Sequence, residues 1–234
     1  MGRDRAFTQR DFKLIGAGIY TVPEASRLTN VSTWRIKRWI RGYTFKNRGE
    51  VHASPPVVPH ELGILDGLIA LSFLDLVEIK FVDAFLDRGV SWKALRHAIT
   101  RGRALVHHSH PFSTRKFWTD GRTILMELAE RDVALLNLIN NQLEFKRVIR
   151  QFLSKLDFER DQAVRWWPLG KHYRIVVDPQ RSFGQPIVHD EGVPTAVLAK
   201  AHKVEKSLAK VASWFEMSKK SVRDAVKFEQ LLAA

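Results

Sequence analysis

Apolar residues near the start of the chain recur every three or four positions, which is the spacing of one buried helical face. The first such stretch runs from Val22 to about Leu28. Thr21 occupies its N-cap position, and Glu24 follows three residues later, as in a capping box. After a tight turn, Ser32 caps a second stretch, Thr33 to Arg41. The pattern therefore predicts two short helices joined by a turn.

The second predicted helix has an apolar seam and a basic outer face. Ile36, Trp39 and Ile40 form the seam, and Gly42 ends the helix. The outer face holds no acidic residue, whereas a merely solvated face normally mixes both signs. Such a helix can enter the major groove of DNA, so the pattern predicts a helix-turn-helix; the alternative is a small amphipathic hairpin with solvated charges. The candidate DNA-binding residues of this face are Thr33, Trp34, Arg35, Lys37, Arg38 and Arg41.

A β-hairpin is predicted directly after this helix. Apolar and polar residues alternate over residues 43–46, residues 47–49 supply a turn, and Val51 begins a return strand. Lys46 and Arg48 lie at the tip, where they would hold a phosphate or reach the minor groove. The hairpin is thus either a DNA-contacting wing or an ordinary hairpin with a polar turn.

The middle of the chain gives a mixed pattern after a proline-rich link. Helical spacing predicts a long helix from Ser72 to about Arg88 and another from Trp92 to about Thr100. Asp-Gly between apolar residues predicts a hairpin over Lys116 to Met126. A helix is expected from Phe145 to about Leu156, and short strands are expected within residues 158–177.

Three further helices are predicted at the C-terminal end, over residues 194–201, 208–215 and 219–231. The last two again have the shape of a helix-turn-helix. The outward cations of the final helix form a candidate second face for nucleic acid or a protein partner, made of Lys219, Lys220, Arg223 and Lys227.

Two local clusters suggest other chemistry. His107, His108 and His110 lack the i, i+4 spacing of a helical metal site, so a polar surface loop is favoured and no metal is expected. Stacking on bases is one interpretation of Trp166 and Trp167, but burial is favoured because tryptophan removes a large apolar area from water.

Composition supports a polyanionic partner. The chain has 234 residues with 38 Lys and Arg against 25 Asp and Glu, a formal charge of +13. The absence of cysteine excludes disulfides and thiolate zinc sites. No apolar run approaches the roughly 20 residues of a membrane span, and no signal core is visible, so a cytoplasmic protein is expected. No nucleophile–base pair, phosphate loop or paired-carboxylate motif is present, so we expect neither an enzyme nor a cofactor.

Two segments resemble known families. Residues 20–25 (YTVPEA), 31–32 (VS) and 37–42 (KRWIRG) resemble the winged helix-turn-helix of MerR-type regulators, although Trp34 replaces the small polar residue usual there. The family resemblance implies that helices after the wing brace the DNA reader and form a dimer.

The last quarter resembles a small helical domain found in VapB-type antitoxins. The matching residues lie in 178–179 (DP), 184–188 (GQPIV), 193–195 (VPT) and 207–228. Where that family usually carries Gly-Thr-Arg, this chain has Asp-Glu-Gly before Val193. Together the two resemblances imply an antitoxin that represses its own promoter and silences a PIN-type ribonuclease toxin.

The expected fold is α+β, mainly α with short hairpins. A winged helix-turn-helix (1–60) would be followed by a helical and β-hairpin middle region for bracing and dimerisation (61–177), and by a homeodomain-like three-helix module (178–234). The expected partners are double-stranded DNA, a second copy of the chain and the toxin, with no membrane. The alternative function is a stand-alone MerR-like regulator that senses a small molecule in a pocket lined by Trp118, Trp166 and Trp167.

Overall fold

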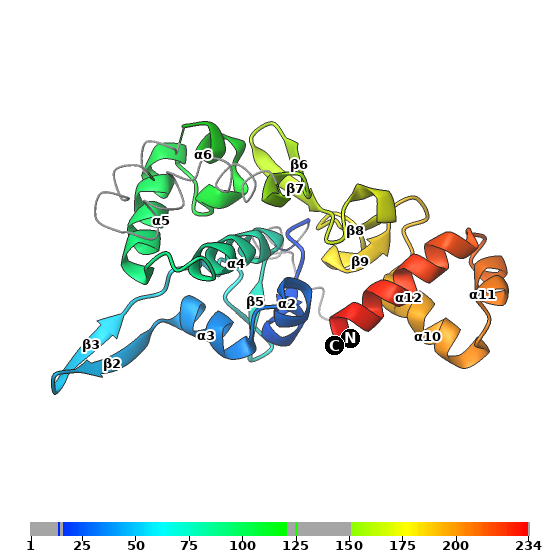
Figure 1. Cartoon of the computed structure of the whole chain (residues 1–234), viewed down its shortest axis with the longest axis horizontal. Helices are drawn as coiled ribbons and strands as arrows, with labels where there is room; N and C mark the ends of the chain where they lie inside the picture. The colour runs from blue at the N-terminus through cyan, green and yellow to red at the C-terminus, as the bar shows by residue number, and fades with distance from the viewer. Residues whose placement is uncertain (1–13, 15, 121–124, 126–150, 234) are drawn as a thin grey trace, which may run out of the picture.

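A computed structural model describes residue 14, residues 16–120, residue 125 and residues 151–233. Helices and small antiparallel sheets are mixed throughout, which makes the fold α+β. Figure 1 shows a hairpin projecting at one end of the molecule and a group of three helices at the other. Most of the predicted helix from Phe145 lies outside the described residues, although Leu156 itself begins a strand.

The two helices predicted near the start of the chain are confirmed. Glu24 N–H donates to the Thr21 hydroxyl and Thr21 N–H donates to the Glu24 carboxylate, so the capping box is formed. Asn30 adopts a left-handed conformation at the end of the first helix, and Ser32 caps the second. The elements of this region are β1 (Tyr20–Thr21), α2 (Val22–Thr29) and α3 (Thr33–Arg41).

The hairpin predicted after α3 is also present, formed by β2 (Tyr43–Asn47) and β3 (Glu50–Ser54). Gly42 starts it with a φ of +72°. A Cβ at this position would lie 2.4 Å from the carbonyl oxygen of Ser54, so only glycine fits here. The hairpin is the projecting arm in Figure 1.

The region that follows packs against the first two helices. The strand β5 pairs antiparallel with both β1 and β4. The long helix α4 is buried along most of its length, and Ser72 forms a capping box with Asp75 at its start. The elements are β4 (Ile64–Leu65), β5 (Leu68–Leu71), α4 (Phe73–Leu86), α5 (Trp92–Val106), the 3-10 helix η1 (Pro111–Ser113) and α6 (Arg115–Asp120).

The hairpin predicted from Lys116 is wrong over residues 116–120, which are helical. The Thr114 hydroxyl accepts a hydrogen bond from Phe117 N–H, which stabilises the first turn of α6. The Phe117 side chain is then buried against Phe112. The Asp-Gly signal is therefore overridden by capping and burial. The rest of the predicted hairpin, apart from Leu125, lies outside the described residues.

A four-stranded antiparallel sheet follows in the order β6-β7-β8-β9. Trp166 and Trp167 are both buried, which confirms the predicted burial. Short strands occur within residues 158–177, as expected. The elements are β6 (Leu156–Glu159), β7 (Gln162–Trp166), β8 (Ile175–Val177), β9 (Pro186–Val188) and the 3-10 helices η2 (Lys171–Tyr173) and η3 (Ser182–Gly184).

The three C-terminal helices are present close to their predicted positions, as α10 (Thr195–Glu205), α11 (Leu208–Trp214) and α12 (Lys219–Ala233). They surround a core of their own that includes Leu198 and Phe228. The larger core of the molecule extends from Tyr20 to Val177. It therefore combines side chains from α2 and α3 with side chains from α4, α5 and β7.

Within the described part of the chain, no helix combines the length and apolar character needed to cross a membrane.

Candidate nucleic-acid interface

The outer face of α3 is exposed to solvent. Thr33, Lys37 and Arg41 are exposed, and the Trp34 residue is 62% exposed. The opposite side of the helix is closed by the buried apolar seam, as predicted. The sequence thus folds α3 so that its cations and one large aromatic ring face outward together.

Arg38 connects α3 with the hairpin. Its guanidinium carbon lies 4.3 Å from the ring centroid of Trp34 and 3.5 Å from that of Tyr43. Two aromatic faces thus hold one planar cation by cation–π contact. Hydrogen bonds with Ser54 and Arg38 lower the pKa of the Tyr43 hydroxyl, although its slight burial opposes them. The stack fixes Arg38 at the junction of the two elements.

The hairpin extends this surface with both apolar and charged groups. Phe45 is 45% exposed and stacks on His52, with ring centroids 5.4 Å apart. Lys46 and Arg48 are exposed near the tip, as predicted. Glu50 follows them on the return strand, 4.0 Å from the His52 ring, so this arm is less uniformly basic than α3.

Arg35 differs from the other candidates on α3, because its guanidinium turns toward α4. It lies 2.9 Å from an Asp83 carboxylate oxygen and 3.5 Å from one of Asp87. Burial raises the pKa of Asp83, and the Arg35 charge counteracts that shift. Arg35 therefore joins the candidate interface to the body of the molecule, and its expected contact with DNA stays a prediction.

The second basic face, on α12, lies at the other end of the molecule from the hairpin (Figure 1). Lys219, Lys220, Arg223 and Lys227 are all exposed. However, the Lys220 ammonium pairs with Asp224 at 2.6 Å. The structure therefore keeps the two candidate faces apart.

A buried charged network was missed by sequence reasoning. His110 is fully buried, and its Nε2 lies 2.8 Å from the Asp75 carboxylate, so the expected surface loop is wrong at this residue. Glu78 is also buried and accepts a hydrogen bond from Phe112 N–H. Burial raises the pKa of Glu78 to about 7. Among the described residues, no group of His, Asp and Glu has an arrangement that could hold a metal ion.

The three tryptophans of the expected ligand pocket lie in different surroundings. The Trp118 ring packs against the ring of Phe81, and Trp167 packs with Val176 and Ile187. Of the three, Trp166 alone lines a cleft between α2, α4 and α12.

The chain is similar in sequence to a named protein and in fold to a solved structure. No protein-family profile matches the sequence. The chain is 26% identical over 226 residues to the Mycobacterium tuberculosis protein named "Putative antitoxin VapB45", covering 89% of this chain and 92% of that protein. The crystal structure of Rv2018 from Mycobacterium tuberculosis has the same fold, with a TM-score of 0.68 and 23% identity, covering 88% of this chain and 96% of that one.

Proposed function

We propose that this chain is the DNA-binding antitoxin of a type II toxin–antitoxin pair. It binds its own promoter through α3 and the β2–β3 hairpin and neutralises a PIN-type ribonuclease toxin. The antitoxin role is supported by the similarity to the VapB45 protein over most of both chains. We further propose that it is a regulatory protein rather than an enzyme and that it works in the cytoplasm as a homodimer.

One observation carries the DNA-binding part: the exposed cationic face of α3 is continuous with a projecting hairpin through the Trp34–Arg38–Tyr43 stack. Helices α2 and α3, followed by this hairpin, have the element order of a winged helix-turn-helix, in which the second helix enters the major groove. The exposed cations are then placed to meet phosphates on either side of the groove.

Roles can be assigned to the exposed side chains. Lys37 and Arg41 on α3 contact phosphates, as do Lys46 and Arg48 on the hairpin. The clamped Arg38 presents its guanidinium edge in a fixed plane, which suits a bidentate contact. Thr33 and Trp34 lie at the start of α3, where apolar atoms would meet a thymine methyl or a sugar.

Fluorescence anisotropy with a labelled duplex from the sequence upstream of the gene tests the DNA-binding part. Lys37→Ala and Arg41→Ala should each weaken binding and reduce the slope of log affinity against log salt by about 1, because each removes one phosphate contact. Lys203→Ala removes an equally exposed cation from α10 and should change neither quantity. Equal losses of DNA affinity in all three variants would show that binding depends on net charge and not on the α3 face.

The antitoxin part is tested by co-expression with the product of the neighbouring gene. Growth arrest caused by that product should be relieved by this chain and also by the Lys37→Ala/Arg41→Ala variant, provided that the toxin binds away from α3. A chain that binds DNA but never relieves arrest would leave a regulator without an antitoxin role. The two parts of the proposal therefore fail separately.

The α12 face extends the same proposal. Helices α10–α12 form a three-helix group of the kind expected for a homeodomain-like module, and this group lies at the other end of the molecule from the hairpin (Figure 1). Lys219, Arg223 and Lys227 then serve as a second contact for DNA or for the toxin. Substitution of these three residues should weaken one of the two activities above without affecting the other.

A further inference from the structure

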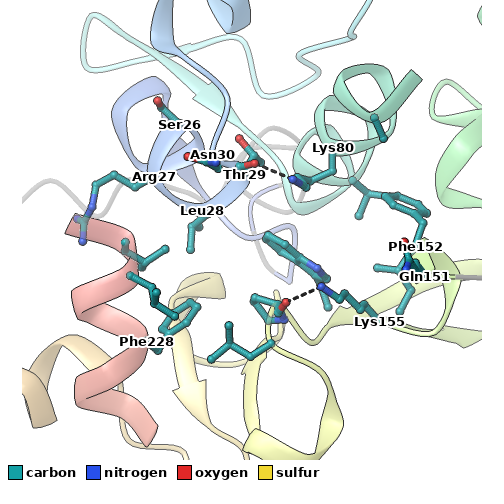
Figure 2. Close-up of a pocket in the computed structure, with 18 of the residues that line it drawn as sticks. Ser26, Arg27, Leu28, Thr29, Asn30, Lys80, Gln151, Phe152, Lys155 and Phe228 are labelled. Atoms are coloured by element: carbon teal, nitrogen blue, oxygen red, sulfur yellow. Dashed lines mark hydrogen bonds between the residues drawn. The ribbon is translucent and has the colours of Figure 1, made fainter. Parts of the chain in front are cut away.

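A large cleft lies behind the candidate DNA-binding helices. It measures about 800 Å³ and lies between the end of α2, α4, the segment from Gln151 to Leu156 with β7, and α12. Figure 2 shows side chains from these separate parts of the chain converging on one hollow. A volume of several hundred Å³ is typical of sites that hold small organic molecules.

The charged residues that line this cleft are cationic over the described part of the chain. They are Arg27, Lys80, Arg88 and Lys155, and none of the described lining residues is a carboxylate. Arg27 is partly neutralised by Glu229 at 3.4 Å. Over the described ranges, Lys80, Arg88 and Lys155 have no carboxylate within ion-pair distance. Three cations without an ion-pair partner among the described residues, around one concave surface, create a positive potential that favours an anion.

These cations retain unused hydrogen-bond donors. Lys80 donates to the carbonyl of Thr29 at 2.8 Å, and Lys155 donates to that of Pro168 at 3.0 Å (Figure 2). An ammonium group has three donors, so each lysine can bind a further acceptor. The Nε of Arg88 is buried and has no hydrogen-bond partner among the described residues. A buried donor without an acceptor is costly, so Arg88 carries an unsatisfied donor at the wall of the cleft.

The pKa of the Lys80 ammonium is lowered, which agrees with a partly buried cation that has no ion-pair partner among the described residues. Burial lowers the pKa of the Lys80 ammonium; the Asp83 carboxylate opposes this effect, and the charge of Lys155 adds to it. Asp83 is itself engaged with Arg35. A bound anion near Lys80 and Lys155 would screen their mutual repulsion.

Apolar side chains cover the remaining surface of the cleft. Each of the surrounding elements contributes at least one of them. They are Leu28 from α2, Val77 from α4, Phe152 from the segment before β6, Trp166 from β7 and Phe228 from α12. An inorganic ion would leave this surface exposed to water. A ring or alkyl chain would cover it and gain the free energy of apolar burial.

We propose that this cleft binds a small organic anion, in which a carboxylate, sulfonate or phosphate is joined to an aromatic or aliphatic body. The acidic group meets Lys80, Arg88 and Lys155, and the apolar body packs among Leu28, Trp166 and Phe228. The inference stands on the cleft alone and does not depend on DNA binding.

The probe for this test is 8-anilinonaphthalene-1-sulfonate, which joins an aromatic body to one negative charge. Titration calorimetry should find one site per chain, and tryptophan excitation should sensitise the emission of the bound probe through Trp166. The uncharged analogue N-phenyl-1-naphthylamine should bind at least about tenfold more weakly, because it lacks the anion.

Two matched variants locate the site. Lys155→Met removes an exposed ammonium from the cleft and should weaken probe binding about fivefold or more. Lys171→Met removes an exposed ammonium that lies outside the cleft and pairs with Asp157, so it should leave the affinity unchanged. Trp166→Phe should lower the sensitised emission of the bound probe, while the other six tryptophans of the chain remain as donors.

Three results would overturn the proposal. They are several equivalent weak sites per chain, an affinity that Lys155→Met and Lys171→Met change equally, and binding of the uncharged analogue as tightly as the sulfonate. Urea unfolding of each variant distinguishes a lost site from a lost fold.

Discussion

Glu78 is a buried carboxylic acid within α4. Its carboxyl is buried in α4 near His110 and accepts a hydrogen bond from Phe112 N–H at 2.7 Å. Burial raises its pKa from 4.5 to about 7, and the neighbouring His110 charge limits that rise. A raised pKa means that the folded state binds the proton more tightly than the unfolded state does. The resulting stabilisation is complete below pH 4.5 and is lost as the pH rises to about 7.

Glu78→Gln should remove this pH dependence. The amide keeps an oxygen for the Phe112 N–H but cannot ionise, so the variant should gain stability relative to the wild type between pH 4 and pH 8, by roughly 3 kcal/mol. Urea unfolding at a series of pH values measures the difference. Glu216→Gln, at an exposed position, should give no such trend. A constant difference between Glu78→Gln and the wild type would contradict this account.

The Arg35–Asp83 ion pair joins α3 to α4. Arg35→Ala leaves the Asp83 carboxylate, which is largely buried, without its partner at 2.9 Å and should cost about 1–3 kcal/mol of stability. Asp83→Asn in the same chain should restore part of the loss, since the buried charge is then absent. Unfolding free energies of the two single variants and the double variant give the coupling energy. A coupling near zero would mean that the pair is only a surface contact.

At the scale of elements, Gly42 determines how the hairpin leaves α3. Gly42→Ala places a Cβ 2.4 Å from the Ser54 carbonyl oxygen at a φ of +72° and should cost about 2 kcal/mol or more. Gly49→Ala is the matched control, because its φ is +86° but no atom lies within 4 Å. It should cost about 1 kcal/mol. Thermal unfolding compares the two, and equal losses would show that the contact with Ser54 is unimportant.

Elements with strong local signals could be predicted from the sequence. The capping box at Thr21, the cap at Ser32 and the glycine at 42 each act within a few residues, and they set the ends of α2 and α3 correctly. The helix α6 could not be predicted in this way. Its first turn depends on Thr114 and on burial of Phe117 against Phe112, and this packing outweighs the local Asp-Gly signal.

In the candidate site, too, local features could be predicted from the sequence and long-range contacts could not. The exposure of Lys37 and Arg41 follows from helical periodicity alone. The turn of Arg35 toward Asp83 does not, since the partners lie on α3 and α4 and meet only in the folded chain. The burial of His110 likewise depends on Asp75, 35 residues earlier in the chain, whose carboxylate forms a hydrogen bond with the imidazole Nε2. Long-range partners of this kind leave no periodic signal.

The molecule as a whole places its two basic faces at opposite ends of one connected structure. The main core links α2 and α3 to α4, α5 and β7, and Arg27 of α2 pairs with Glu229 of α12 at 3.4 Å. The division into domains at residues 60 and 177 stays a prediction, although the core that includes Leu198 and Phe228 is distinct from the larger one. The Arg27–Glu229 pair therefore joins the helix that precedes the candidate DNA reader to the helix that carries the second basic face.

The most direct test of the central claim is a gel shift with DNA from immediately upstream of the gene, at low salt, with and without the product of the neighbouring gene. We expect a shift that resists an excess of scrambled duplex and becomes tighter when the neighbouring product is added. A shift that ignores the neighbour would leave a stand-alone regulator. No shift at low salt, where phosphate contacts are strongest, would contradict DNA binding through α3 altogether.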